Sequence, residues 1–175
     1  MNFVMKFGDT NFIGVANTEE YKSFVSEDWD VDDLLFKHIA EEMKNGYILF
    51  FQMTAEGIEH SWNVEVLIDS EEENIEQSCF RKASGFIKVT HEQLFLVDYD
   101  CITMAAQFEN HKVPDQNCSQ YRIEIPNGDY QVEVFQYYNV DDDEYTGTNQ
   151  KDILLHFRKA DQFQDIADKT FWYTY

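Results

Sequence analysis

The sequence predicts a mainly β (α+β) fold, an antiparallel β-sandwich or a strongly bent sheet of about nine strands with one main helix near residues 30–45. Short segments rich in β-branched and aromatic residues recur along most of the chain, and clusters of turn-forming residues separate them. Only one stretch has a clear helical spacing of apolar residues. With 43% hydrophobic and 16% aromatic residues, the chain can bury a full core, and we expect residues 1–175 to form a single domain.

The predicted strands differ in how apolar and polar residues alternate. "YRIEI" (121–125) and "YQVEVFQ" (130–136) alternate regularly, which is typical of a strand with one buried face. "YILFFQM" (47–53) is apolar on both faces and suits a central strand. The nine segments cover residues 2–8, 11–16, 47–53, 62–68, 85–90, 94–100, 121–125, 130–138 and 152–159.

The main helix is predicted within residues 26–46. Its apolar residues recur at spacings of three and four and form one stripe: Val31, Leu34, Leu35, Ile39 and Met43. Asp30 or Asp28 can cap the N-terminus, and Gly46 can take the left-handed conformation that often ends a helix. A short second helix is a further expectation over residues 160–170.

Between two of the alternating segments lies "PNGD", in which Asn127 and Gly128 can supply the positive φ angles of a tight turn. The sequence therefore predicts a β-hairpin that joins residues 121–125 to residues 130–138.

The net charge limits the possible partners. Thirteen Lys and Arg residues stand against 34 Asp and Glu residues, which gives a formal net charge of −21 at pH 7. Such a field repels phosphate backbones and anionic membranes, so we expect neither nucleic acid nor a membrane as a partner. It attracts a basic protein or a divalent cation. The sequence shows no signal-peptide pattern and no apolar run long enough to span a membrane, which favours a cytoplasmic location.

Residue patterns for metal binding and catalysis are weak. Cys79, Cys101 and Cys118 are odd in number and lack a C-x-x-C spacing, so we expect buried reduced thiols and no zinc knuckle. The acidic run at 141–144 fits no EF-hand register, although an irregular calcium site stays open. The five histidines are dispersed, and no hydrolase or phosphate-loop motif occurs. The sequence therefore predicts a protein that is not an enzyme and has no cofactor, with an unrecognised hydrolase as a remote alternative.

Carboxylates cluster at three places, 27–33, 69–76 and 141–144, and each cluster adjoins aromatic residues. Helix capping explains the first cluster, whereas nothing local requires four carboxylates at 141–144. Aromatic residues supply binding energy at interfaces, and surrounding charges speed encounter and select the partner. The predicted partner-binding residues are Asp141, Asp142, Asp143, Glu144 and Tyr145 at the centre, Tyr137 and Tyr138 as aromatic anchors, and Glu71, Glu72 and Glu73 as a second acidic lobe.

One short motif carries a resemblance. Ile125, Pro126, Gly128, Asp129, Tyr130 and Val132 follow a helix and a "GYILFFQ" strand. In this order the chain, over roughly residues 30–140, resembles the competence-protein nuclease inhibitors and the immunity proteins of polymorphic-toxin (contact-dependent inhibition) systems. The resemblance implies a cytoplasmic inhibitor of a cationic nuclease or other toxin. The shared positions are turn and core positions, so it assigns no binding residue.

These observations together predict an immunity or inhibitor protein that binds and neutralises a basic toxin, a nuclease in the first instance, one to one through an acidic surface flanked by aromatic residues. The alternative is a β-sandwich module that binds a glycan or small molecule through exposed Trp and Tyr rings, with calcium in the acidic loop.

Overall fold

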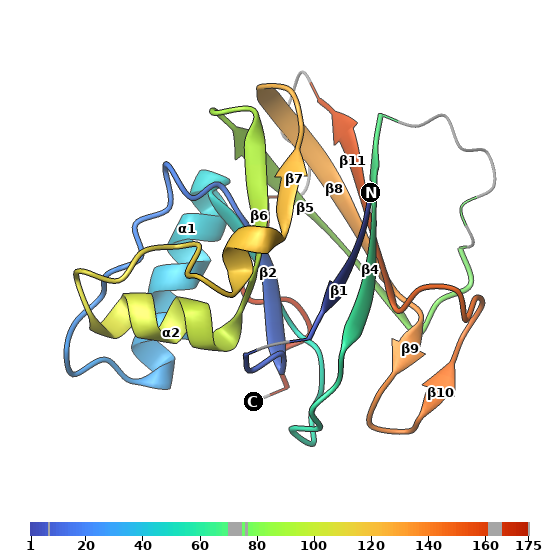
Figure 1. The fold of residues 1–175 in the computed structure, drawn as a ribbon. Helices are drawn as coiled ribbons and strands as arrows, with labels where there is room; N and C mark the ends of the chain where they lie inside the picture. Colours follow the sequence, from blue (N-terminus) through green and yellow to red (C-terminus); the bar gives the residue numbers. More distant parts are fainter. Residues whose placement is uncertain (7, 70–74, 76, 161–165, 175) are drawn as a thin grey trace.

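The computed structural model describes residues 1–6, 8–69, 75, 77–160 and 166–174. In this part of the chain the strands form a five-stranded sheet, a four-stranded sheet and a two-stranded ribbon (Figure 1). Eleven strands and few helical segments confirm the predicted mainly β, α+β class.

All nine predicted strands are present, several with shifted ends. In chain order the elements are β1 (Asn2–Met5), β2 (Phe12–Ala16), a π-helical segment (Asp32–His38), α1 (Ile39–Asn45), β3 (Ile48–Gln52), β4 (Trp62–Ile68), β5 (Arg81–Val89), β6 (Gln93–Asp98), α2 (Tyr99–Gln107), a 3₁₀ turn (Cys118–Gln120), β7 (Arg122–Glu124), β8 (Gly128–Gln136), β9 (Tyr138–Asn139), β10 (Glu144–Tyr145) and β11 (Ile153–Lys159). The short strands β9 and β10 were not predicted as a separate ribbon.

The five-stranded sheet has the order β1-β4-β11-β8-β5, and the four-stranded sheet has the order β3-β2-β6-β7. Every pair is antiparallel except β4 and β11, which run parallel with Ile153 opposite Val64. The expectation of purely antiparallel strands is therefore wrong at this pair. β4 and β8 run in opposite directions, so β11, which lies between them, can be antiparallel to only one of them. In Figure 1, α1 and α2 lie beside the four-stranded sheet, and the five-stranded sheet lies on its other side.

One continuous cluster of buried side chains unites both sheets and the helices. It includes Phe50 of β3, Trp62 of β4, Ile87 of β5 and Leu35 of the main helix. A second, small cluster lies on the opposite face of β8 and β11 and consists of Phe135, Tyr137 and Leu154. Most of the aromatic residues that the sequence offers as possible binding residues are therefore core residues.

The main helix consists of the π-helical segment and α1, and it begins and ends where the sequence predicts. The backbone N–H of Asp33 donates to Asp30 Oδ1 (2.8 Å), so Asp30 rather than Asp28 caps it. Gly46 ends it with a φ of 76°. Leu34, Leu35, Ile39 and Met43 are buried, whereas Val31 is exposed. The stripe therefore begins one turn later than expected.

The predicted hairpin at Asn127–Gly128 is wrong. β7 pairs with β6 in one sheet, and β8 pairs with β5 and β11 in the other, so the chain crosses between the sheets here. Pro126 has no N–H to continue a ladder, and the side chain of Asn127 accepts a hydrogen bond from the backbone of Glu92 (2.6 Å). The crossing lets the apolar faces of both strands, which contain Ile123 and Val132, enter the shared core.

Helix α2 was missed because the segment 94–100 reads as a strand to its end. Asp98 ends β6 and caps α2, since its Oδ1 accepts a hydrogen bond from the backbone N–H of Cys101 (2.8 Å). Burial raises the pKa of Asp98 to about 6, against the lowering effect of hydrogen bonds from Cys101 and Cys118.

Of the helix expected over 160–170, residues 161–165 lie outside the described residues, and the described remainder is not helical.

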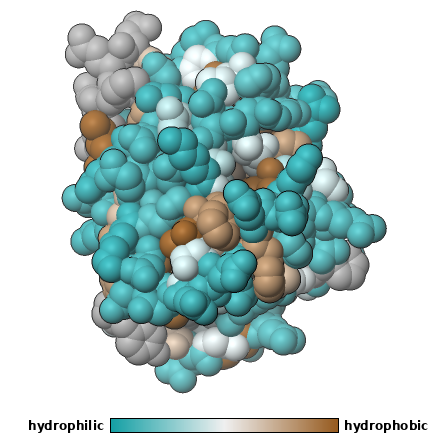
Figure 2. Space-filling model, turned by 90° about the vertical axis from the view of Figure 1, so that its left-hand side faces the viewer, coloured by the Kyte–Doolittle hydropathy of each residue, from teal (hydrophilic) through white to brown (hydrophobic). Residues whose placement is uncertain are grey.

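Figure 2 looks onto the side of the molecule that carries α1 and α2. This face is mostly hydrophilic, with a small group of apolar side chains near its middle. Exposed apolar residues of the helical segments include Phe36 and Met104. Within the described part of the chain, no helix is long and apolar enough to span a membrane.

Gly46 and Gly57 offer a matched test of the close contact between the main helix and β5. Both have positive φ, but a Cβ at Gly46 would lie 2.4 Å from the Phe86 ring, whereas a Cβ at Gly57 would meet nothing within 4 Å. We expect Gly57→Ala to cost about 1 kcal/mol for its backbone conformation. Gly46→Ala should cost about 1–3 kcal/mol more, because of the steric overlap. Urea denaturation of both variants measures the difference, and equal losses would contradict this packing.

Candidate functional site

The acidic run folds into a short β-ribbon, which we call the acidic ribbon (residues 138–145). Glu144 pairs with Asn139, and Tyr145 pairs with Tyr138. Asp143 takes a φ of 52° in the turn between the two strands. Figure 1 shows the ribbon at the same end of the five-stranded sheet as the loop between β3 and β4. The acidic run is therefore a defined projection beside a second loop.

A buried carboxylate just before β11 holds this region together. Asp152 has no exposed surface. It accepts hydrogen bonds from the backbone N–H of Asn63 (2.8 Å), the Asn63 side-chain amide (3.2 Å) and the Tyr145 hydroxyl (2.7 Å), and His60 Nε2 lies 3.3 Å away. Burial acts to raise its pKa, but these contacts outweigh it and hold the pKa below the usual value. Asp152 thus stays ionised and joins β4, β10 and β11.

Aromatic rings pack the acidic ribbon onto β4. The His60 ring lies 4.6 Å from the Trp62 ring and 4.7 Å from the Tyr138 ring, and Tyr138 lies 4.6 Å from Tyr145, all between centroids. The Tyr138 hydroxyl donates to Asp143 Oδ1 (2.7 Å), and this hydrogen bond is the main reason that the pKa of Tyr138 rises to about 12. The ribbon therefore has a fixed orientation rather than the freedom of a solvated loop.

Asp141 has a structural task that its sequence position does not reveal. Its carboxylate accepts hydrogen bonds from the Thr54 hydroxyl and from the backbone N–H groups of Ala55 (2.8 Å) and Glu56 (3.2 Å). Burial opposes ionisation, but these bonds and the charge of Arg81 lower the pKa of Asp141. Asp141 thus turns inward and fastens the loop of residues 54–61 to the ribbon.

The remaining acidic residues of the ribbon face solvent. Asp142, Asp143 and Glu144 are exposed, and Tyr145 exposes 41% of its surface beside them. The fastened loop adds two exposed carboxylates and Ile58, which is 40% exposed. We call this surface the acidic face, and its members are Glu56, Ile58, Glu59, Asp142, Asp143, Glu144 and Tyr145.

Three parts of the predicted binding set need comment. Tyr137 is fully buried and stacks on Phe135 at 6.4 Å with an interplanar angle of 8°, so its expected role as a surface anchor is wrong. Tyr138 is 8% exposed and serves mainly to pack the ribbon. The predicted second lobe, Glu71, Glu72 and Glu73, lies outside the described residues.

The sequence reading missed the loop of residues 54–61 as part of the site. Its signal was present, since "AEGIEH" combines a turn glycine with two carboxylates and an isolated apolar residue. What the sequence lacks is any sign that Asp141 reaches this loop from a distant part of the chain.

Comparison with known proteins places the fold. No family model and no curated protein sequence matches the chain. A solved structure described as crocagin biosynthetic gene J matches with a TM-score of 0.54 and 10% identity, over 91% of this chain and 94% of that one. ComJ of Bacillus subtilis, an inhibitor of the DNA-degrading activity of NucA, matches with a TM-score of 0.47 and 11% identity, over 91% of this chain and 96% of that one.

The crocagin likeness shows that the two chains share a fold. A nuclease inhibitor is thus among the structural neighbours of this chain. The resemblance to polymorphic-toxin immunity proteins stays a prediction. At these identities the function of this chain has to be argued from its own surface.

The inward role of Asp141 predicts a difference between adjacent carboxylates. Asp141→Asn removes an acceptor from a site with three donors, so we expect a loss of about 1–3 kcal/mol in the free energy of unfolding. Asp142→Asn is the matched control, because Asp142 is exposed and accepts a hydrogen bond from the side-chain amide of the neighbouring Asn139. That variant should stay within about 0.5 kcal/mol of the parent. Chemical denaturation measures both, and similar losses would show that Asp141 does not fasten the loop.

The bond from Tyr145 to Asp152 predicts a pH-dependent contribution to stability. Because the pKa of Asp152 is lowered in the folded chain, this stabilisation is present above about pH 4 and is lost as pH falls further. Tyr145→Phe should therefore cost about 1–3 kcal/mol at pH 7 and progressively less below pH 4. Tyr121→Phe is the control, because that hydroxyl accepts from the backbone N–H of Lys6. Its cost should not change over this range, and a pH-independent cost for Tyr145→Phe would refute the assignment.

Proposed function

We propose that this chain is a non-catalytic inhibitor that binds a basic protein through the acidic face and blocks its action. The observation that carries the proposal is the pairing of exposed carboxylates with partly exposed Tyr145 and Ile58 on a surface that hydrogen bonds to Asp141 and Asp152 hold in place. The proposed partner is a toxin that acts on nucleic acid, a nuclease in the first instance, bound one to one in the cytoplasm.

Rigidity supports a binding role for this surface. A partner that meets a preformed surface loses less conformational freedom than one that must order a loop. Asp152 fixes one strand of the ribbon, the packed aromatic rings fix its face, and Asp141 fixes the neighbouring loop. These contacts hold in place the backbone that carries the exposed carboxylates.

Charge supports a basic partner. Enzymes that act on nucleic acid carry Lys and Arg where phosphates bind, and a rigid row of carboxylates can occupy such a cleft. The formal charge of −21 adds long-range attraction, which raises association rates at low salt. The sequence resemblance to competence nuclease inhibitors points to the same class of partner.

A charge-matched pair of triple variants tests the role of the acidic face. Asp142→Asn/Asp143→Asn/Glu144→Gln removes three exposed charges from the acidic face. The control, Asp32→Asn/Glu41→Gln/Glu109→Gln, removes three exposed charges from the helical segments and the residues just after α2. The partner is first captured from an extract of the source cells with the parent chain and identified by mass spectrometry. We expect the acidic-face variant to bind it about tenfold more slowly at low salt, and the control close to the parent rate.

The captured protein must also be inhibited. Adding the parent chain should abolish its nuclease or other toxic activity at equimolar ratio, and the acidic-face variant should require an excess. Equal association rates for the two triple variants would remove the acidic face from the proposal. A large rise in thermal midpoint on adding Ca²⁺, lost in the acidic-face variant, would instead favour the calcium-dependent ligand-binding alternative.

A further inference from the structure

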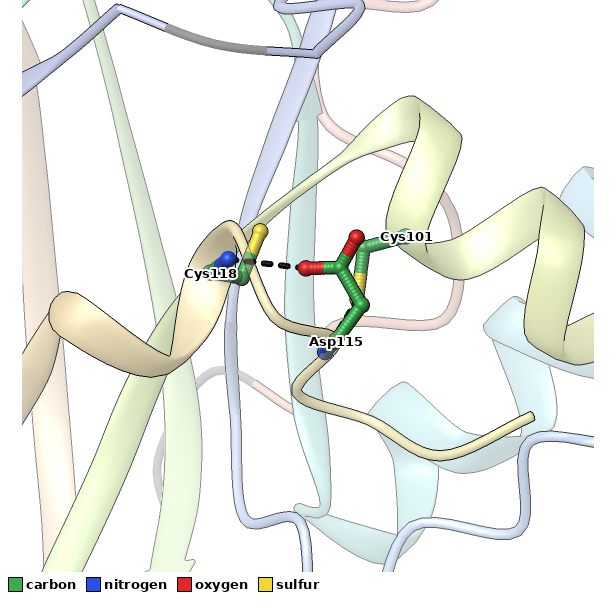
Figure 3. A group of neighbouring side chains, drawn as sticks. All are labelled: Cys101, Asp115 and Cys118. Carbon is green, nitrogen blue, oxygen red and sulfur yellow. Dashed lines mark hydrogen bonds between the residues drawn. The ribbon is translucent and has the colours of Figure 1, made fainter.

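Two thiols and a carboxylate from separate segments meet near the start of α2 (Figure 3). Cys101 lies in the first turn of α2, and Asp115 and Cys118 lie in the segment that leads to β7. Their possible ligand atoms, the two Sγ atoms and one carboxylate oxygen, all lie within 4.8 Å of one another. Cys101 and Cys118 are buried, and Asp115 is partly exposed, so the group has a route to solvent on one side.

A second carboxylate lies beside this group. Asp98 is 1% exposed and accepts a hydrogen bond from the Cys118 thiol. Its negative charge next to the thiols is a further feature that a bound cation would offset.

We propose that Cys101, Cys118 and Asp115, with a water molecule as the fourth ligand, form a binding site for a divalent cation of the zinc type. Zn²⁺ favours tetrahedral sets of thiolate, imidazole and carboxylate ligands. Its bond lengths place the ligand atoms of a tetrahedron about 3.5–4 Å apart, so the side chains need to move inward only slightly. Binding replaces the two thiol protons, which pass to solvent, and no electron is transferred.

Backbone contacts around the cluster fit this role. The N–H of Asp115 donates to Cys101 Sγ (3.4 Å), and the N–H of Cys118 donates to Asp115 Oδ1 (2.7 Å). Such donors orient first ligands and partly neutralise thiolate charge in metal sites. Hard cations such as Mg²⁺ and Ca²⁺ are disfavoured, because two of the three protein ligands are sulfur.

The sequence argument against a zinc knuckle concerned spacing alone. The ligands here come from both ends of the excursion between β6 and β7, which lie side by side in the four-stranded sheet. A bound cation would therefore join the start of α2 to the entry of β7. This role is independent of the acidic face, so each proposal can fail without the other.

Cobalt titration of the full chain tests the site directly. The chain is prepared reduced and free of metal, and Co²⁺ serves as the spectroscopic probe. We expect one Co²⁺ per chain, with thiolate-to-cobalt charge-transfer absorption and the visible bands of tetrahedral cobalt, both lost on adding Zn²⁺. Cys118→Ser should lose the charge-transfer absorption in large part. Cys79→Ser is the matched control and should keep it, because Cys79 lies outside the cluster.

A measurement on the unaltered chain guards against variants that fail to fold. Zn²⁺ should protect Cys101 and Cys118, but not Cys79, from alkylation as read by mass spectrometry. At about a hundredfold excess over its dissociation constant, it should also raise the thermal midpoint by about 5–10 °C. The proposal is overturned if Zn²⁺ changes neither labelling nor midpoint, or if Cys118→Ser keeps the full cobalt spectrum. It is equally overturned if the two thiols are joined as a disulfide and the reduced chain binds no Co²⁺.

Discussion

The geometry of the acidic face depends on one buried carboxylate. Asp152 cannot be hydrated, so its charge is tolerated only because donors surround it. Those donors come from Asn63 of β4 and from Tyr145 in the second strand of the acidic ribbon. Its own backbone bonds continue the pattern, since its N–H donates to Asn63 and its carbonyl accepts from Tyr137. The projecting ribbon is therefore fixed by an electrostatic requirement of the core.

Hydrogen-bond donors also separate the roles of four consecutive carboxylates that look equivalent in sequence. Asp141 turns inward to backbone donors, and its three neighbours remain exposed. The exposed carboxylates of the ribbon therefore depend on two other carboxylates, Asp141 and Asp152, whose hydrogen bonds hold the ribbon and the neighbouring loop in position. The aromatic residues divide similarly, because Tyr137 supports a small core whereas Tyr145 lies at the surface.

Much of the fold was predictable because local patterns and tertiary burial agree. The nine strands and the main helix, with its Asp30 cap and terminal Gly46, could all be found from periodicity and capping residues. The corner at Asn127 was not, because a turn dipeptide cannot show whether the next strand returns to the same sheet or crosses to another. Helix α2 was hidden because Asp98 ends a strand and caps a helix at once.

The kinds of residue in the candidate site could be predicted from the sequence, but the contacts that position them could not. Acidic and aromatic clustering indicated the run at 141–144 as a candidate, but the donors that hold Asp141 lie in the loop at 54–56, far away in sequence. The same limit applies to Cys101 and Cys118, which no local spacing rule connects. Residues that meet only through sheet topology leave no trace in a single sequence.

The central position of β11 has a consequence for synthesis on the ribosome. This strand follows every other strand in the chain, yet it lies between β4 and β8. Until it emerges, the five-stranded sheet exists as two separate pieces with unpaired edges, and the pocket for Asp152 has no occupant. Because such non-local pairing is slow and exposed edges invite association, we expect nascent chains to depend on chaperones until β11 has left the ribosome.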